Sequence, residues 1–189
     1  LILFGIFFLA LFLKPYVMGA DGWSDEKYIG RGSNPKVLPL NDGVAVVWLD
    51  GHELYVWKNG NARKLCEAEV YDIVSTEQRI YLVTENRFFV MDTQFMVIEE
   101  KSIYLNPVPE HISLAIVNDT VYMAYSSLET YVAVMDNGTL NTIMVSKNDG
   151  IKSFKPVIVG VNDVIHVFWE DEHGMYAGSN LSLIHISEP

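Results

Sequence analysis

The chain has 189 residues, half of them hydrophobic, and its 24 acidic and 13 basic side chains give a formal net charge of −11. This length and apolar content are enough for a real core, so intrinsic disorder is excluded and one domain is expected. The acidic balance repels phosphate backbones and anionic headgroups, which argues against a nucleic-acid reader or a peripheral membrane binder.

The chain begins with an apolar run over residues 1–13, followed by Lys14, Pro15 and small residues up to Ala20. A run of this length suits the hydrophobic region of a secretory signal peptide, with cleavage after Ala20. The sequence shows no initiator Met and no basic segment before the run, so a longer membrane anchor is the alternative. We therefore predict an exported protein, secreted or at the cell surface, in which residues 1–20 are a signal peptide or anchor and provide the only membrane contact.

The last nine residues, 181–189, resemble the in-frame translation of a transposase sequencing adaptor at every position. We expect that this tail is not native. The folded part is then predicted over residues 21–180, as an incomplete domain.

A repeat of about forty residues runs through this central part. Residues 35–55 align with residues 156–176 without a gap, and Pro, Asn-Asp, Trp, Asp, His and Tyr recur at one constant offset. Two weaker copies lie between them. Anchored on Val44, Ile80, Val121 and Ile165, the spacings are 36, 41 and 44 residues. A period of this size is typical of stacked repeat units.

Within each copy the hydrophobic residues alternate with a period of two, and turn dipeptides such as Asp50-Gly51 and Asn59-Gly60 separate the runs. The first copy predicts strands over residues 36–40, 43–49, 53–58 and 62–66. The third copy predicts strands over residues 112–117, 121–126, 130–135 and 140–145. The predicted fold class is all-β, a partial β-propeller of about four four-stranded antiparallel blades, and the alternative is a β-sandwich. We expect six to eight blades in the intact protein.

Strand direction predicts two groups of loops. The second-to-third turns and the connections between blades share one face, where we expect ligand binding because loops on a rigid scaffold often carry function. The candidate residues on that face are Asp50, His52, Arg87, Glu129, Asp171 and His173. The opposite face carries the sequons that begin at Asn118 and Asn137, which predict N-glycosylation of an exported chain.

The segment from Ser146 to Phe154 resembles the Asp-box of sialidase-like propellers, Ser-x-Asp-x-Gly-x-x-Thr-Trp. Ser146 and Gly150 match, whereas Asn148, Ser153 and Phe154 replace Asp, Thr and Trp. In that family the box is a structural turn, so the resemblance implies a fold and not catalysis. The segment falls between two blades, and not at the third-to-fourth turn where the family carries the box.

A working sialidase needs three arginines that clamp a carboxylate, a Tyr nucleophile with a Glu, and an acidic proton donor. The central part has four arginines, and none lies in the Phe/Tyr-Arg-Ile-Pro motif of such enzymes: Arg31, Arg63, Arg79 and Arg87. We therefore predict no catalytic residue in this chain. The alternative is a sialidase-like glycoside hydrolase whose catalytic residues lie partly in missing blades.

The two Asp-x-His turns lack a full set of metal ligands, so no metal and no cofactor is predicted. Trp48 and Trp169 end apolar strands and are expected to pack between blades. The single cysteine, Cys66, excludes a disulfide framework and is expected to be a small buried hydrophobe. The predicted function is therefore an extracellular or cell-surface binding scaffold for a protein or glycan ligand, with no role in nucleic-acid binding.

Overall fold

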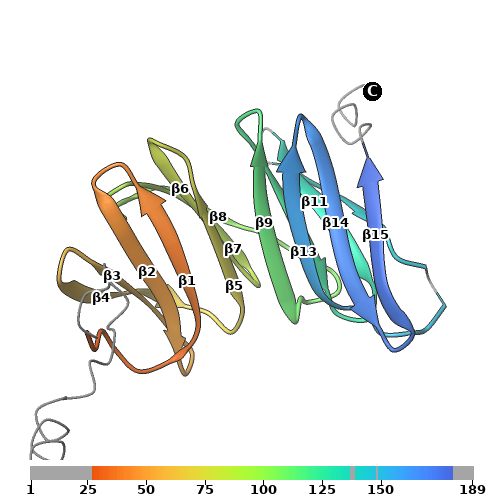
Figure 1. The fold of residues 1–189 in the computed structure, drawn as a ribbon, viewed down its shortest axis with the longest axis horizontal. Helices are drawn as coiled ribbons and strands as arrows, with labels where there is room; N and C mark the ends of the chain where they lie inside the picture. The colour runs from red at the N-terminus through yellow and green to blue at the C-terminus, as the bar shows by residue number, and fades with distance from the viewer. Residues whose placement is uncertain (1–26, 137–138, 148, 181–189) are drawn as a thin grey trace, which may run out of the picture.

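A computed structural model describes residues 27–136, 139–147 and 149–180, and this part of the chain consists of β-strands, turns and connections without a helix (Figure 1). It therefore contains no helix long and apolar enough to cross a membrane. The predicted leader over residues 1–20 and the adaptor-like tail over residues 181–189 lie outside the described residues.

Fifteen described strands form four antiparallel sheets, and in each sheet the strands lie side by side in chain order. Sheet 1 contains β1 (Ser33–Leu40), β2 (Gly43–Asp50), β3 (Glu53–Lys58) and β4 (Asn61–Glu67). Sheet 2 contains β5 (Tyr71–Ser75), β6 (Arg79–Thr84), β7 (Arg87–Asp92) and β8 (Val97–Ser102). Sheet 3 contains β9 (His111–Val117), β10 (Thr120–Ser126), β11 (Thr130–Asp136) and β12 (Thr139–Met144). Sheet 4 contains β13 (Phe154–Val161), β14 (Val164–Asp171) and β15 (Gly174–Asn180).

The four sheets are blades of a β-propeller. They follow one another in a row, with sheets 1 and 4 at opposite ends (Figure 1). The first strand of each sheet contacts the first strand of the next, so that β1 lies by β5, β5 by β9 and β9 by β13. This arrangement confirms the predicted all-β fold of about four blades and excludes a β-sandwich, in which two sheets would face each other.

The core consists of three layers, one between each pair of neighbouring sheets. Leu54 of sheet 1 and Ile80 of sheet 2 are fully buried in the first layer. Met123 belongs to the second layer and Ala124 to the third. Because successive residues of β10 pack in opposite directions against two different sheets, nearly the whole strand is buried. The simple alternation expected for half-exposed strands is therefore lost in the middle blades.

The backbone of the first repeat copy recurs in the last. Register shifts occur in β1 between Ser33 and Lys36 and in β13 between Phe154 and Val157, which are equivalent positions of the two copies. The bulged residues Asn34 and Lys155 have positive φ angles of 51° and 40°. The duplication predicted from sequence thus extends to an irregular feature of the strand.

The side chains of the two copies also correspond. Trp48 stacks on Tyr55 with ring centroids 5.8 Å apart and an interplanar angle of 19°. Trp169 stacks on Tyr176 at 6.0 Å and 15°. Both tryptophans are buried, at 6% and 8% exposure. Trp169 belongs to the core layer between sheets 3 and 4, as predicted, whereas Trp48 is in none of the three layers and packs against the backbone at Gly30 and Gly32. Cys66 is partly buried against the first core layer, and burial raises the pKa of its thiol.

A buried carboxylate joins three sheets. Asp72 in β5 is 5% exposed, and its Oδ2 accepts a 2.7 Å hydrogen bond from the Leu114 backbone N–H in sheet 3. Its Oδ1 lies 3.0 Å from Nζ of Lys36 in sheet 1. Because both partners come from the first strands of neighbouring sheets, Asp72 fixes how these strands lie against one another.

Candidate binding site

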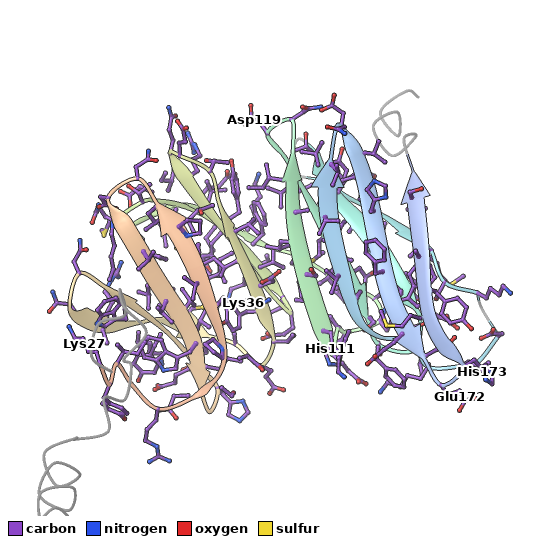
Figure 2. The ribbon with its side chains drawn as sticks, viewed as in Figure 1. Lys27, Lys36, His111, Asp119, Glu172 and His173 are labelled. Atoms are coloured by element: carbon purple, nitrogen blue, oxygen red, sulfur yellow. The ribbon has the colours of Figure 1, made fainter. Side chains whose placement is uncertain are left out.

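The loops of the four sheets form two faces, as the strand directions predict. Figure 2 shows Glu172, His173 and His111 along the lower edge of the molecule and Asp119 at the upper edge. We call the edge with the second-to-third turns and the inter-sheet connections the lower face, and the other edge the upper face. All six candidate binding residues belong to turns or strand ends of the lower face.

The β2–β3 turn, which carries Asp50 and His52, is exposed to solvent. The His52 side chain is 79% exposed, and its Nδ1 lies 3.6 Å from Oε1 of Glu69. The His52 carbonyl oxygen accepts a 2.9 Å hydrogen bond from the Ala68 backbone N–H. This turn is held by its neighbours but forms no enclosed site.

Arg87, at the start of β7, is engaged by its own blade and by the end of β4 in sheet 1. Its Nη2 donates a 2.7 Å hydrogen bond to the Glu67 carbonyl oxygen, and its Nη1 lies 3.5 Å from Oε1 of Glu100. The guanidinium also stacks on the Phe89 ring at 5.1 Å from its centroid. Arg63 donates instead to backbone carbonyl oxygens at positions 94 and 95, beside β8. These two arginines therefore do not converge on a common carboxylate.

Glu129 is buried and does not present its carboxylate to solvent. It is 5% exposed, and its Oε2 accepts a 2.5 Å hydrogen bond from the Ser146 hydroxyl. The Ser146 oxygen in turn accepts a 2.9 Å hydrogen bond from the Thr130 backbone N–H. Within the described residues, the hydroxyl oxygens of Ser126 and Thr130 are also buried, without a hydrogen-bond partner. The buried polar side chains of Ser126, Glu129, Thr130 and Ser146 therefore lie where the β10–β11 turn meets the connection from sheet 3 to sheet 4.

Six residues of that connection line one side of a cavity of about 190 Å³ on the lower face: Val145, Ser146, Lys147, Asp149, Ile151 and Ser153. Sheet 4 lines the other side with Trp169, Asp171, His173 and Tyr176. The cavity therefore brings two of the predicted residues, Asp171 and His173, together with side chains of the connection. Asp50, His52, Arg87 and Glu129 are not among its lining residues.

The cavity carries two carboxylates that local turns hold in place. Oδ1 of Asp171 accepts hydrogen bonds from the backbone N–H groups of His173 and Gly174, at 2.7 and 3.1 Å. Oδ1 of Asp149 accepts a 3.1 Å hydrogen bond from the Ile151 N–H. Both aspartates thus occupy the Asx-turn geometry that this residue type favours. Burial of the Tyr176 hydroxyl and the nearby negative charges of Asp171 and Asp149 raise the pKa of that group.

The Asp-box-like segment forms the connection itself. Ser146 and Ser153 line the cavity, and Gly150 has a positive φ of 78° at the turn after Asp149. Phe154 begins β13, while Asn148 lies outside the described residues. The segment is a turn between two blades, as the sequence indicates, and its sialidase-type resemblance stays a prediction.

A second, larger cavity of about 520 Å³ lies on the upper face, lined by the β5–β6 turn and Asp119. The predicted glycosylation site Asn118 is exposed in the adjoining β9–β10 turn, with a positive φ of 49°. A glycan on Asn118 would stand beside this upper cavity and leave the lower one open. Asn137 lies outside the described residues.

The residues that sequence reasoning missed are Asp149 and Tyr176. Tyr176 is the repeat equivalent of Tyr55, so the sequence could have indicated its stacking on Trp169. Nothing in the sequence indicated that Tyr176 lies at a cavity. Among the described residues, no three His, Cys, Asp or Glu side chains come together in a way that could hold a metal ion.

Comparison with known proteins gives similarity of fold only. No family model matches the sequence, and no curated protein matches it. Similar solved structures include BBS1N in a complex with ARL6DN, at 12% identity and a TM-score of 0.47, covering 73% of this chain and 50% of that chain. A prolyl endopeptidase is 16% identical with a TM-score of 0.46, covering 77% of this chain and 26% of its own.

The WD40 domain of SCAP from fission yeast is 14% identical with a TM-score of 0.43, covering 72% of this chain and 39% of its own. This chain thus spans half or less of the length of these three structures. At such scores the blade architecture rests on the strand order and sheet packing of this chain, and its function rests on its own surfaces.

Proposed function

We propose that this chain is an exported β-propeller that acts as a binding scaffold for a protein ligand, outside the cell or at its surface. The observation that carries the proposal is the lower-face cavity, where a rigid sheet and an inter-sheet connection bring aromatic, acidic and hydroxyl side chains together. A concave site with a few convergent polar groups is the usual form of a binding site.

Export is supported by the apolar run over residues 1–13 and by the exposed sequon at Asn118. Expression in a secretory eukaryotic host tests it. We expect the chain in the medium or on the cell surface, with a glycan that an endoglycosidase removes. Asn118→Gln should abolish one glycan without loss of folding, because the side chain is exposed at a turn. Retention of the chain in the cytosol without any glycan would contradict export.

The face that binds is tested by placing a photo-crosslinking amino acid at single positions. His52 and His173 report on the lower face, whereas Gln78 and Asp119 are matched exposed positions on the upper face. We expect covalent adducts with a partner protein from the lower positions only. Adducts from the upper positions alone, or from none of the four on the native cell surface, would refute the proposal.

A further inference from the structure

The two copies of the Trp–Tyr stack differ in what surrounds them. In sheet 1, the stack of Trp48 and Tyr55 is closed by the chain itself, because the backbone at Gly30 and Gly32 lies directly on the indole. A Cβ at Gly30 would lie 2.5 Å from Cζ2 of Trp48, and one at Gly32 would lie 2.3 Å from its Cδ1. Glycine is therefore required for this close approach.

In sheet 1 a carboxylate joins the tyrosine of the stack to a lysine of the same sheet. The Tyr55 hydroxyl donates a 2.7 Å hydrogen bond to Oε2 of Glu53, and Nζ of Lys64 donates a 2.7 Å hydrogen bond to Oε1 of the same carboxylate. The hydrogen bond from Lys64 lowers the pKa of Glu53 and the same bond raises the pKa of Lys64. Tyrosine, carboxylate and ammonium thus form one local set in the first copy.

In sheet 4 the equivalent stack faces a cavity. Trp169 and Tyr176 line it, and Tyr176 is 38% exposed. Gly174 stands at the position of Glu53, and the negative charge is supplied instead by Asp171 and Asp149. The aromatic stack of the first copy is thus kept in sheet 4, but here it lies beside a cavity with carboxylates from other positions.

The lining of the cavity has two carboxylates and one lysine ammonium, so its charge is negative. Asp149 and Asp171 belong to its lining, together with Lys147 and His173. The imidazole of His173 lies 3.7 Å from Oε1 of Glu172, an exposed residue that does not line the cavity. A cation between carboxylates and an aromatic ring gains charge-assisted hydrogen bonds and a cation–π contact.

We propose that this cavity binds an organic cation, the ammonium or guanidinium group of a lysine or arginine side chain on a basic peptide segment of the protein ligand. The proposal rests on the proposed binding function and names the chemistry of its contact. In the complex, the ligand's cation pairs with the carboxylates of the cavity as Lys64 pairs with Glu53 in the first copy. The backbone of the peptide remains outside, since a cavity of about 190 Å³ accommodates a side chain and not a folded partner.

The test uses the chain purified from a secretory host, and nuclear magnetic resonance to follow the indole N–H of Trp169. The probes are the tripeptides Gly-Arg-Gly and Gly-Lys-Gly, the neutral analogue Gly-citrulline-Gly, and agmatine as a free small cation. We expect saturable shifts of the Trp169 signal with the two cationic peptides and none with the citrulline peptide. Added salt should weaken the binding because the carboxylates are near the surface.

Variants identify the groups responsible. Asp149→Asn with Asp171→Asn keeps an Oδ1 acceptor for the two turns and removes both charges, and we expect affinity for Gly-Arg-Gly to fall by about tenfold or more. Asp50→Asn is the matched control, since it makes the same change at the equivalent turn of the first copy, and it should leave the affinity unchanged.

Equal shifts with the citrulline peptide, or unchanged affinity of the double variant, would overturn the cation site. Agmatine binding more tightly than both peptides would overturn the peptide as the source of the cation. If the lower-face crosslinks persist but the cavity binds no cation, this inference alone is refuted. Loss of the lower-face crosslinks would refute the proposed function, whatever the cavity binds.

Discussion

Gly160 in β13 is the position where the packing of sheet 3 against sheet 4 is most sensitive to a single methyl group. A Cβ on Gly160 would lie 2.1 Å from Cγ2 of Val117 and 3.4 Å from the Ile116 carbonyl oxygen. Carbon atoms in contact are normally about 3.5–4.0 Å apart. Gly160→Ala therefore forces Val117 or the sheets themselves to move by roughly 1.5 Å, judged against that contact distance.

The cost of this displacement follows from the surroundings of Val117. Its side chain is 8% exposed and belongs to the core layer between sheets 3 and 4. As a β-branched residue it has few alternative rotamers. Overpacking of this kind destabilises by about 1–3 kcal/mol. For a domain of this size each kcal/mol lowers Tm by roughly 2–4 °C, so a decrease of about 2–12 °C is expected.

Thermal unfolding followed by circular dichroism measures the effect, and the chain provides its own control. A Cβ at Gly178 in β15 would lie 3.5 Å from Cζ3 of Trp169, an ordinary contact, so Gly178→Ala should change stability by less than about 0.5 kcal/mol. Val117→Ala added to Gly160→Ala removes the clashing methyl, and the double variant should be more stable than the sum of the single effects by about 1 kcal/mol. Equal stability of the two glycine variants, or strict additivity in the cycle, would refute the described packing of β9 against β13.

Three further outcomes are expected. Trp169→Ala should destabilise the chain by about 3–5 kcal/mol because the indole is buried between sheets 3 and 4, and unchanged melting with lost ligand binding would show that its role is contact alone. Asp72→Ala leaves a buried N–H of sheet 3 without its acceptor, and we expect a loss of about 2–4 kcal/mol in urea unfolding. Lys36→Met should also destabilise, because it leaves the buried Asp72 carboxylate without its ammonium partner, and unchanged stability of both variants would contradict the described role of Asp72. The hydrogen bond from Lys152 holds the pKa of Glu110 below its ordinary value of 4.5, so its contribution is present above that pH and is lost as the pH falls through the lowered pKa. A Tm measured from pH 6 to pH 3 should therefore decrease less steeply in Glu110→Gln, and identical slopes would contradict this assignment.

The repeated blades were predictable from sequence because the pattern has two independent parts. Alternating apolar residues marked the strands, and dipeptides that tolerate positive φ marked the turns. At Asn59 and Gly60 both φ angles are positive, 51° and 88°, as the tight β3–β4 turn requires. The predicted strands over residues 53–58 and 130–135 match β3 and nearly match β11, which ends at Asp136. These features depend on neighbouring residues only.

The first residues of β1 could not be predicted from the local sequence pattern. The sequence predicted a strand from residue 36, but β1 begins at Ser33, beyond a bulge with Asn34 at a φ of 51°. Pro35 and the positive φ of Asn34 interrupt the regular ladder, so the apolar alternation does not reach Ser33. The equivalent bulge in β13 falls at Lys155, a residue type with no preference for positive φ. Pairing with the second strand holds both bulges in place.

Glu129 could not be placed from sequence, for a related reason. A charged residue in a short turn between two strands is normally solvated. Here the connection to sheet 4 folds back over the turn, and the Ser153 N–H donates a 2.7 Å hydrogen bond to the Leu128 carbonyl oxygen. The Ser146 hydroxyl then satisfies the carboxylate. Burial of Glu129 is thus decided by contacts between segments that a strand pattern does not relate to one another.

The same folding-back creates the lower-face cavity. The connection covers the turn of sheet 3 at one end and approaches the Trp–Tyr stack of sheet 4 at the other, so Ser146 and Trp169 line one space. In sheet 1 the segment at Gly30 and Gly32 lies directly against the equivalent indole, where a Cβ on either residue would clash. Glycine in one copy and larger residues in the other, at Ile151 and Ser153, account for this difference. Blade geometry is therefore common to both copies, whereas the surroundings of the stack differ with the side chains of the preceding segment. Under the proposed function, substitutions that change ligand preference should be sought in that segment.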